Sequence, residues 1–317
     1  MPQFTIGPFE LDARLGRGGM GSVWGGVHSA RGVRVAVKVL HARFANDSWF
    51  RSSFSSEVRA VARLDHQNIV TILDHGVLGR ADLPGLPADE PDIGVGSAWL
   101  AMEHLGGQPM TRFKGRCPWD RLLPWLRGLL AGLGHAHARG LLHRDLKPAN
   151  VLVDGDRAVL VDFGLARELD AEPDVAHDGL VVGTPAYMAP EQFEADDAAF
   201  GPWTDLYGLG CLVWSLVSGA GPYGQRRPHL ELHHAHANLP LPRLMTRVAV
   251  PVGFEGWLRR LLAKHPLDRY RCAADALHGL EQVAAETTGW APVHAPPEVP
   301  RSPVPAPMAA RWPARVR

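Results

Sequence analysis

The sequence has little cysteine and no excess of either charge. Its three cysteines, Cys117, Cys211 and Cys272, are far apart and form no CxxC pair. This odd, scattered set argues against a disulfide framework or a zinc site, and it favours a reducing compartment, most simply the cytoplasm. Lysine plus arginine and aspartate plus glutamate number 33 each. No overall field therefore draws the chain to nucleic acid or to an anionic membrane, and charged partners must be recognised locally.

The sequence also lacks a hydrophobic run long enough to span a membrane. Its most apolar stretch, residues 206–221, contains two serines and several glycines. It is shorter than the roughly 18 to 20 residues that a membrane-spanning helix needs. We expect it to form a buried helix. Residues 1–16 carry acidic side chains and no long apolar core, so they are not expected to be a secretory signal.

The first hundred residues favour β-strands. Runs rich in β-branched and aromatic residues predict strands at 9–16, 21–28, 33–40, 70–73 and 98–102. Residues 52–65 have helical spacing, with Ser55 or Ser56 as the expected N-cap. Residues 76–96 are rich in proline, glycine and aspartate, and we expect an irregular hairpin insertion there.

Helices are expected to dominate from Trp119 onward. Residues 119–140 form a long pattern that is apolar on one face and closed by a glycine. The change of class predicts an α+β chain of two lobes, a small mostly-β lobe with one helix and a larger helical lobe, with a ligand cleft between them. Residues 283–317 are proline-rich, and we expect an extended or disordered tail.

A glycine cluster is the first signal of chemistry. Residues 15–23 follow the pattern GxGGxGxV, and glycine lets a backbone approach phosphates closely. The pattern alone also suits an ordinary glycine-rich hairpin. Lys38 lies within the apolar run 33–40, where a buried ammonium needs an anion such as Glu57 or an ATP phosphate. The alternative is a lysine on the wet face of an edge strand.

A second motif is much more specific. Residues 143–153, HRDLKPANVLV, place Asp145, Lys147 and Asn150 within one loop, and Asp162 follows in VLVDFG. This set can accept a hydroxyl proton, neutralise a transferring phosphoryl group and hold a metal ion. Magnesium is usually bound by one or two carboxylates together with phosphate oxygens. The order and spacing of these residues indicate phosphoryl transfer.

With these motifs the chain resembles a eukaryotic-type (Hanks-type) serine/threonine protein kinase of the bacterial branch. The resemblance covers about residues 9–282 and implies a protein-kinase-like bilobal fold. It implies an N-lobe over about 9–102, a hinge over about 103–107 and a C-lobe over about 108–282, followed by the tail 283–317. The implied cofactors are ATP and Mg²⁺, with Mn²⁺ as an alternative ion, and the implied partners are proteins that carry serine or threonine.

The resemblance also implies roles for individual residues. The implied nucleotide-binding residues are Leu15, Gly16, Gly18, Gly19, Gly21, Val23, Ala36, Lys38, Met102, Glu103, Leu105, Asn150, Leu152 and Asp162. The implied catalytic residues are Asp145, Lys147, Lys38 and Glu57. Asp145 would be the base, Lys147 would steady the γ-phosphate, and Lys38 would bind the α and β phosphates and pair with Glu57. Asn150 and Asp162 would hold the metal ion.

In the segment that resembles the hinge, Met102 would be the gatekeeper, while the Glu103 carbonyl and the Leu105 amide would contact the adenine. The resemblance further predicts that Glu191 of GTPAYMAPE pairs with Arg269, and that Asp205 braces the catalytic loop.

Several histidines are not expected to have a chemical role. His233, His234 and His236 have no acidic or cysteine partner nearby in the sequence, so we expect a solvent-facing stretch and not a metal site. His135 and His137 are expected to serve packing.

The segment between DFG and APE lacks the usual phosphate acceptors. No serine, threonine or tyrosine occurs between Gly164 and Gly183, whereas five acidic residues do: Glu168, Asp170, Glu172, Asp174 and Asp178. One of them could replace the phosphate that usually pairs with the arginine of the HRD motif, here Arg144. The alternative is an acidic, exposed loop.

Two other functions stay open at this point. A pseudokinase or nucleotide-binding scaffold would recruit partners through the tail, where residues 296–303 have PxxP-like spacing, although a plain linker explains that spacing too. A small-molecule kinase of similar fold is the other, and the GTPAYMAPE segment argues against it.

Overall fold

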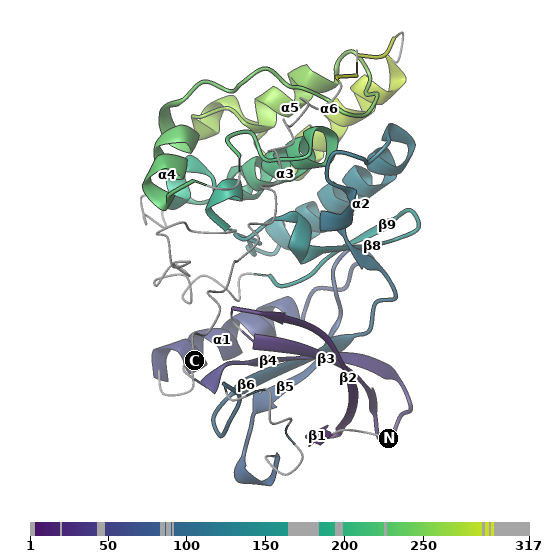
Figure 1. The fold of residues 1–317 in the computed structure, drawn as a ribbon, viewed down its shortest axis with the longest axis vertical. Coiled ribbons are helices and arrows are strands. Elements are labelled where there is room, and N and C mark those ends of the chain that lie inside the picture. Colours follow the sequence, from purple (N-terminus) through teal and green to yellow (C-terminus); the bar gives the residue numbers. More distant parts are fainter. Residues whose placement is uncertain are drawn as a thin grey trace, which may run out of the picture.

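A computed structural model describes two lobes (Figure 1). The described residues are 4–19, 21–42, 48–82, 86, 90, 92–163, 184–193, 199–224, 227–286, 289–291 and 293–294, and only the backbone is described for 48–53. The acidic residues of 164–183 and the PxxP-like segment of the tail lie outside this set. Within the described part of the chain, no helix is both long and apolar enough to cross a bilayer.

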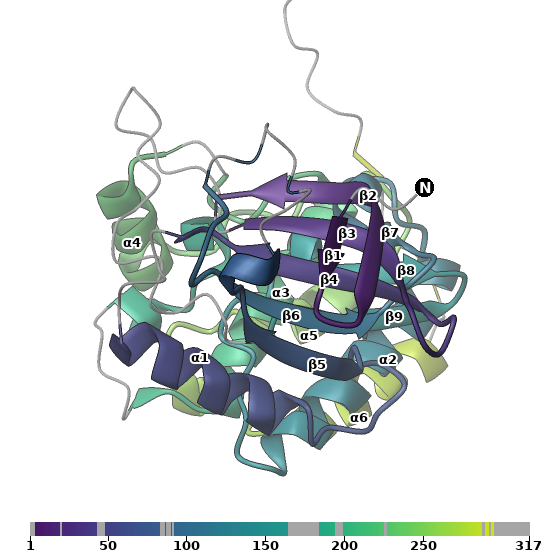
Figure 2. The same cartoon turned by 90° about the horizontal axis from the view of Figure 1, so that it is seen from below.

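The N-lobe is a six-stranded antiparallel sheet with one helix, α1 (Ser48–Val61). Its strands are β1 (Phe4–Ile6), β2 (Phe9–Gly18), β3 (Gly21–His28), β4 (Arg34–Leu40), β5 (Ile72–Val77) and β6 (Ala98–Glu103). They lie side by side in the order β1-β2-β3-β4-β6-β5, with α1 running alongside β5 (Figure 2). The sheet buries apolar side chains on both faces, because side chains alternate along a strand.

Each face of the sheet has its own apolar cluster. The cluster on the face of α1 contains Phe54 and Val58 of that helix together with Ala36, Leu100 and Met102. The cluster on the other face, here called the outer cluster, consists of Phe4, Ile6, Phe9, Leu11, Trp24, Val35, Val37, Val39, Leu78, Ile93, Trp99 and Ala101. Leu78 and Ile93 of the outer cluster belong to the connection between β5 and β6, so this connection covers the sheet.

The structure corrects three local predictions in this lobe. Strand β1, residues 4–6, was not predicted, because a three-residue run gives little periodicity. Helix α1 begins at Ser48, so Ser55 and Ser56 lie inside the helix and neither is its N-cap. The strand expected at 70–73 is displaced, since β5 spans Ile72–Val77. The hairpin connection predicted over 76–96 is confirmed by the antiparallel pairing of β5 with β6.

The C-lobe is built on helices, as predicted. They are α2 (Trp119–His137), α3 (Pro202–Ser218), α4 (His229–Asn238), α5 (Phe254–Leu261) and α6 (Ala273–Ala285). A small sheet, β7 (Gln108–Pro109), β8 (Val151–Asp154) and β9 (Arg157–Leu160), lies at the side facing the N-lobe. Every residue of α3 from Thr204 to Val217 is buried, which confirms the buried helix predicted from the most apolar stretch of the sequence.

The lobes are joined by the chain at 104–107 and by a second contact near β9. The Val70 amide donates to the Leu160 carbonyl (2.9 Å) and the Leu160 amide donates to the Asn68 carbonyl (2.8 Å). Ile69 and Leu160 form an isolated parallel bridge. The Asn68 side-chain amide donates to the Ala158 carbonyl (2.7 Å). Backbone pairing therefore continues from the N-lobe into the C-lobe.

The C-lobe extends past residue 282, where the sequence suggested a boundary. Helix α6 reaches Ala285, and the Ala291 amide then donates to the Val250 carbonyl (2.8 Å) while the His294 amide donates to the Thr246 carbonyl (2.7 Å). The first part of the predicted tail thus pairs with the segment before α5.

Candidate active site

An apolar cluster lies where the two lobes meet. Ala36 of β4 and Met102 of β6 are buried in one cluster, and Val23, Leu105 and Leu152 pack against it. These five residues come from four strands and the inter-lobe connection, yet the fold brings them together. They are five of the residues that the resemblance assigned to the nucleotide, and the structure places all five in or against one apolar cluster.

The glycine-rich turn between β2 and β3 lies close to Val23, which packs against this cluster. Gly18 and Gly21 are paired across the turn. A Cβ atom at Gly16 would meet nothing within 4 Å, and one at Gly18 would meet only the Gly21 carbonyl oxygen, at 4.0 Å. At Gly21, in contrast, a Cβ would lie 2.0 Å from the Val39 carbonyl oxygen. Gly21 is therefore required by strand packing, whereas Gly16 and Gly18 leave backbone open to a ligand.

Lys38 forms an ion pair with the carboxylate of Asp162. Its Nζ lies 2.9 Å from Asp162 Oδ1, and its side chain is 12 % exposed. Burial opposes the charge of Asp162, but the Lys38 ammonium and its hydrogen bond keep the pKa of this carboxyl below its ordinary value. Asp162 has φ = 59°, a left-handed conformation that is uncommon for a residue with a side chain. The sequence did not indicate this backbone geometry.

Glu57 lies on α1, half-buried, one residue before Val58, which belongs to the apolar cluster on the face of α1. The ion pair that the structure gives Lys38 is the one with Asp162. The pairing of Lys38 with Glu57 stays a prediction.

The catalytic loop brings three predicted residues into contact. Asp145 Oδ2 lies 2.7 Å from Lys147 Nζ. The Asn150 side-chain amide donates to the same oxygen and to the Asp145 carbonyl, both at 2.8 Å. Asp145 is 9 % exposed and Asn150 is 6 % exposed. Oδ2 of Asp145 thus contacts both the Lys147 ammonium and the Asn150 amide. These two contacts fix the orientation of the carboxylate, and with it the direction of Oδ1.

A buried aspartate of α3 holds the backbone before Asp145. Asp205 accepts hydrogen bonds from the amides of His143 (2.8 Å) and Arg144 (2.7 Å), and His137 Nε2 lies 2.8 Å from it. Arg144 has φ = 63°, which costs about 1–2 kcal/mol for a residue with a Cβ. Burial opposes the charge of Asp205, but the hydrogen bond from His137 holds its pKa below the ordinary value. The predicted brace of the catalytic loop is confirmed.

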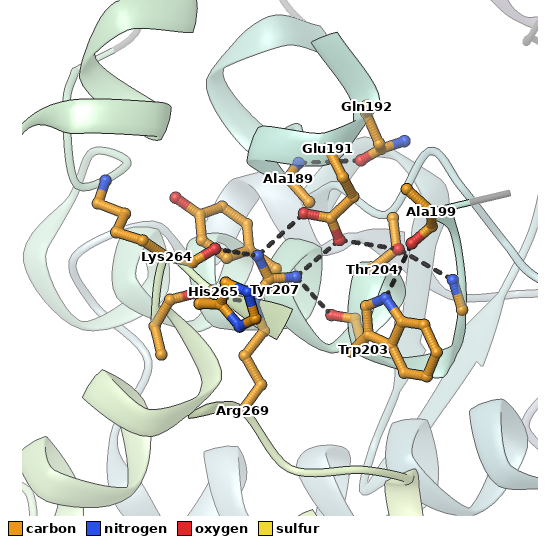
Figure 3. A network of polar contacts seen from close by, with 12 residues as sticks. Ala189, Glu191, Gln192, Ala199, Trp203, Thr204, Tyr207, Lys264, His265 and Arg269 are labelled. Carbon is orange, nitrogen blue, oxygen red and sulfur yellow. Dashed lines mark hydrogen bonds and ion pairs between the residues drawn. The ribbon is translucent and has the colours of Figure 1, made fainter. Parts of the chain in front are cut away.

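The predicted pair between Glu191 and Arg269 is also confirmed, and it is bidentate (Figure 3). Arg269 donates to both Glu191 oxygens, at 2.7 and 2.9 Å, and further to the carbonyls of Ala263, Lys264 and Trp203. Thr204 Oγ1 donates to Glu191 Oε1 (2.9 Å). The Arg269 side chain is fully buried. This network anchors the end of the segment 184–193 to the C-lobe core.

The donor set near Asp162 fits a divalent cation. Asn150 turns its amide nitrogen toward Asp145, so its amide oxygen points the other way. Asp162 keeps its charge and uses one oxygen for Lys38. An amide oxygen and a carboxylate are hard ligands of the kind that Mg²⁺ takes. Both residues therefore fit the role that the resemblance implied for them.

Two histidines, His137 and His236, differ from what the sequence suggested. His137 does more than pack, because it contacts Asp205. His236 is fully buried, not solvent-facing, and its Nδ1 lies 2.9 Å from the Tyr207 hydroxyl. The ring centre of His143, in the HRD motif, lies 4.6 Å from that of Phe163. Its Nε2 is hydrogen-bonded to the Val161 carbonyl oxygen at 3.0 Å. Helical periodicity in α4 is weak, so the sequence had no strong signal for which histidine faces inward. In the described residues no cluster of three His, Cys, Asp or Glu side chains could hold a metal.

Two lobes joined at 104–107, a glycine-rich turn between β2 and β3 and a loop that brings Asp145, Lys147 and Asn150 together are the features of a protein kinase. A family model for the protein kinase domain matches residues 9–274. The crystal structure of the PknI kinase domain of Mycobacterium tuberculosis is 27 % identical, with a TM-score of 0.66, and the match covers 90 % of this chain and 99 % of that one. The chain belongs to the protein kinase family.

Similar curated proteins are bacterial serine/threonine kinases. Pkn1 of Myxococcus xanthus is 36 % identical over 88 % of this chain and 39 % of its own length. PknA of Mycobacterium tuberculosis is 34 % identical over 98 % of this chain and 68 % of its own length. Within the family the chain is therefore a serine/threonine protein kinase, and it spans between about two fifths and two thirds of these two relatives.

Proposed function

We propose that this protein transfers the γ-phosphoryl group of Mg-ATP to serine or threonine hydroxyls of other proteins. The observation that carries the proposal is the contact of Asp145 with both Lys147 and Asn150 in the catalytic loop. Transfer of this group depends mainly on positioning and on charge neutralisation, and these residues supply both.

Each side chain has a distinct task in this mechanism. The apolar side chains of Val23, Ala36, Met102, Leu105 and Leu152 take the adenine, and the peptide groups of Glu103 and Leu105 contact its edge. The open backbone at Gly16 and Gly18 covers the phosphates. Lys38 binds the α and β phosphates. Asn150 and Asp162 would hold Mg²⁺, which supplies charge neutralisation on the phosphate oxygens when it is bound.

The transfer itself uses the catalytic loop. The substrate hydroxyl oxygen bonds to the γ-phosphorus, the bond from that phosphorus to the β–γ bridging oxygen breaks, and ADP leaves. Asp145 accepts the hydroxyl proton on the carboxylate oxygen that does not contact Lys147. The Lys147 ammonium neutralises charge on the moving phosphoryl group. The Glu191–Arg269 anchor supports the segment 184–193 on which a peptide would lie.

The test is phosphotransfer from radiolabelled ATP to a generic basic protein by purified wild type and by Asp145→Asn. We expect the variant to lose about a hundredfold to ten-thousandfold in rate while its unfolding temperature is unchanged. Near-normal transfer by Asp145→Asn would refute the assignment of the base. Nucleotide binding without transfer by the wild type would favour a scaffold.

The acidic segment between Gly164 and Gly183 lies outside the described residues. We propose that one of its carboxylates takes the place of a phosphate opposite Arg144, so that activity needs no phosphorylation there. The absence of a hydroxyl-bearing residue between Gly164 and Gly183 supports this. Activity that collapses after phosphatase treatment of the purified protein would contradict it. The three unpaired cysteines fit action in the cytoplasm, in a bacterial signalling pathway.

A further inference from the structure

A buried carboxylate lies on the outer face of the N-lobe sheet, directly behind the glycine-rich turn. Glu90 belongs to the connection between β5 and β6, and its side chain has no exposed surface. Its Oε1 accepts hydrogen bonds from Ser22 Oγ (2.8 Å) and from Arg14 Nη1 (3.0 Å). Arg17 Nε lies 3.9 Å from its Oε2. A buried charge is costly unless it is paired in this way, so the contact is specific and not incidental.

The three partners of Glu90 all belong to the strands of the glycine hairpin. Ser22 follows Gly21 directly, while Arg14 and Arg17 flank Leu15 and Gly16. Residues paired across two strands point to the same face of a sheet. Arg14 is paired with Trp24 of the outer cluster and Arg17 is paired with Ser22, so all of them face away from the cluster to which we assign the adenine.

A bulge makes this arrangement possible. Arg14 and Arg17 are three positions apart and would face opposite sides of a regular strand. The pairing with β3 shifts between Arg14 and Gly16, so one extra residue is accommodated in β2 there. Both arginines therefore turn toward Glu90. The Arg14 guanidinium also lies 5.9 Å from the centre of the Trp24 ring.

The connection that carries Glu90 is fixed to the sheet. Leu78 and Ile93 are buried in the outer cluster. Leu78 exchanges backbone hydrogen bonds with residues 96 and 97, and the Ala42 amide donates to the Asp92 carbonyl. Described residues on both sides of Glu90 in the sequence, Leu78 and Ile93, are thus packed on the sheet.

We propose that Glu90 is a positioning residue for the glycine-rich turn, and that it sets the affinity of the kinase for the phosphates of its nucleotide. This inference rests on the proposed function. Glu90 touches no substrate. It acts through Arg14 and Ser22. Their hydrogen bonds to Glu90 link both strands of the hairpin to the connection between β5 and β6, and they hold the glycine-rich turn in one conformation. Without these hydrogen bonds the turn must be ordered at the moment of binding, and this loss of conformational freedom weakens the binding of the phosphates.

The variant Glu90→Gln keeps the size of the side chain and removes its charge. We expect the dissociation constant of a non-hydrolysable ATP analogue to rise about tenfold, since hydrogen bonds to a charged group are the stronger kind. The affinity for adenosine, which has no phosphates, should change by less than twofold. The KM for ATP should rise while kcat at saturating ATP and the KM for the protein substrate stay within twofold.

Asp92→Asn is the matched control. Asp92 contacts Arg17 at 3.4 Å from the same connection, but its side chain is more than half exposed, and exposed pairs contribute little. We expect less than a twofold change for either ligand. Ser22→Ala should also weaken the binding of the ATP analogue. In the double variant the two losses of affinity should be less than additive, because both substitutions remove the same contact.

Hydrogen exchange supplies a readout that does not depend on activity. In Glu90→Gln the amides of residues 14–23 should exchange faster, while those of β4 keep their protection. Equal analogue affinity in Glu90→Gln and wild type would overturn the inference, and so would a parallel loss of adenosine and analogue binding. Failure of the wild type to bind either ligand would instead refute the proposed function, and the inference with it.

Discussion

Replacing Arg269 by methionine tests how much the buried anchor contributes to stability. Arg269 makes two hydrogen bonds to Glu191 and three to backbone carbonyls, and its side chain is fully buried. Methionine is of similar length but leaves the Glu191 carboxylate with only the Thr204 hydroxyl among these partners. Removing one member of a buried pair costs about 3–5 kcal/mol. A chain of this size should then lose roughly 6–20 °C in unfolding temperature, at about 2–4 °C per kcal/mol.

The assay is thermal and urea unfolding of wild type, Arg269→Met and the double variant Glu191→Gln/Arg269→Met. The double variant should recover part of the loss, because it removes the uncompensated charge. The exposed pair of Arg127 with Glu281 provides the control, and Glu281→Gln should cost less than about 1 kcal/mol. A loss below about 1 kcal/mol in Arg269→Met, or a double variant less stable than the single one, would refute the reasoning.

The remaining predictions concern pH and strand packing. Burial, with a smaller effect from Lys264, lowers the pKa of His236 to about 3, so the unfolded chain binds a proton below about pH 6.5 that the folded chain does not. Above pH 6.5 this group should not affect the free energy of unfolding, which should fall by about 1.4 kcal/mol per pH unit between pH 6.5 and pH 3. In His236→Phe the free energy of unfolding, measured with urea, should depend less on pH in this range. Equal pH dependence in the variant and the wild type would contradict the assignment. Gly21→Ala should cost about 1–3 kcal/mol, because its Cβ would meet the Val39 carbonyl. Gly16→Ala should have an unfolding temperature within about 1 °C of that of the wild type. Equal losses of stability in Gly16→Ala and Gly21→Ala would contradict the conclusion that strand packing requires glycine only at position 21.

The sequence predicts well those features that depend on local spacing. Asp145, Lys147 and Asn150 lie within six residues of one another, so one loop must bring them close. The strands β2 to β4 and the helices α2 and α3 also follow from hydrophobic patterns. The pairing of Glu191 with Arg269 and the brace by Asp205 came from family resemblance, since no spacing rule brings such distant residues together.

Other features depend on tertiary packing and gave no sequence signal. Glu90 lies among prolines and aspartates in residues 76–96, where a carboxylate is normally exposed. Its burial follows from the bulge in β2, which turns two arginines toward it. His236 became buried because Tyr207 of another helix supplies a hydrogen-bond partner. The left-handed backbone at Arg144 and Asp162 likewise needs the surrounding structure to hold it.

The contact of Asn68, Ile69 and Val70 with Leu160 has a mechanical consequence. Together with the connection at 104–107, it attaches the N-lobe at two places, and a body attached at two places turns most easily about the line through them. Atoms near that line, such as Met102 at the end of β6, move little when the lobes rotate. Strands β2 and β3 lie further across the sheet from that line than β6 does, so the same rotation should displace more strongly the turn to which we assign the nucleotide phosphates.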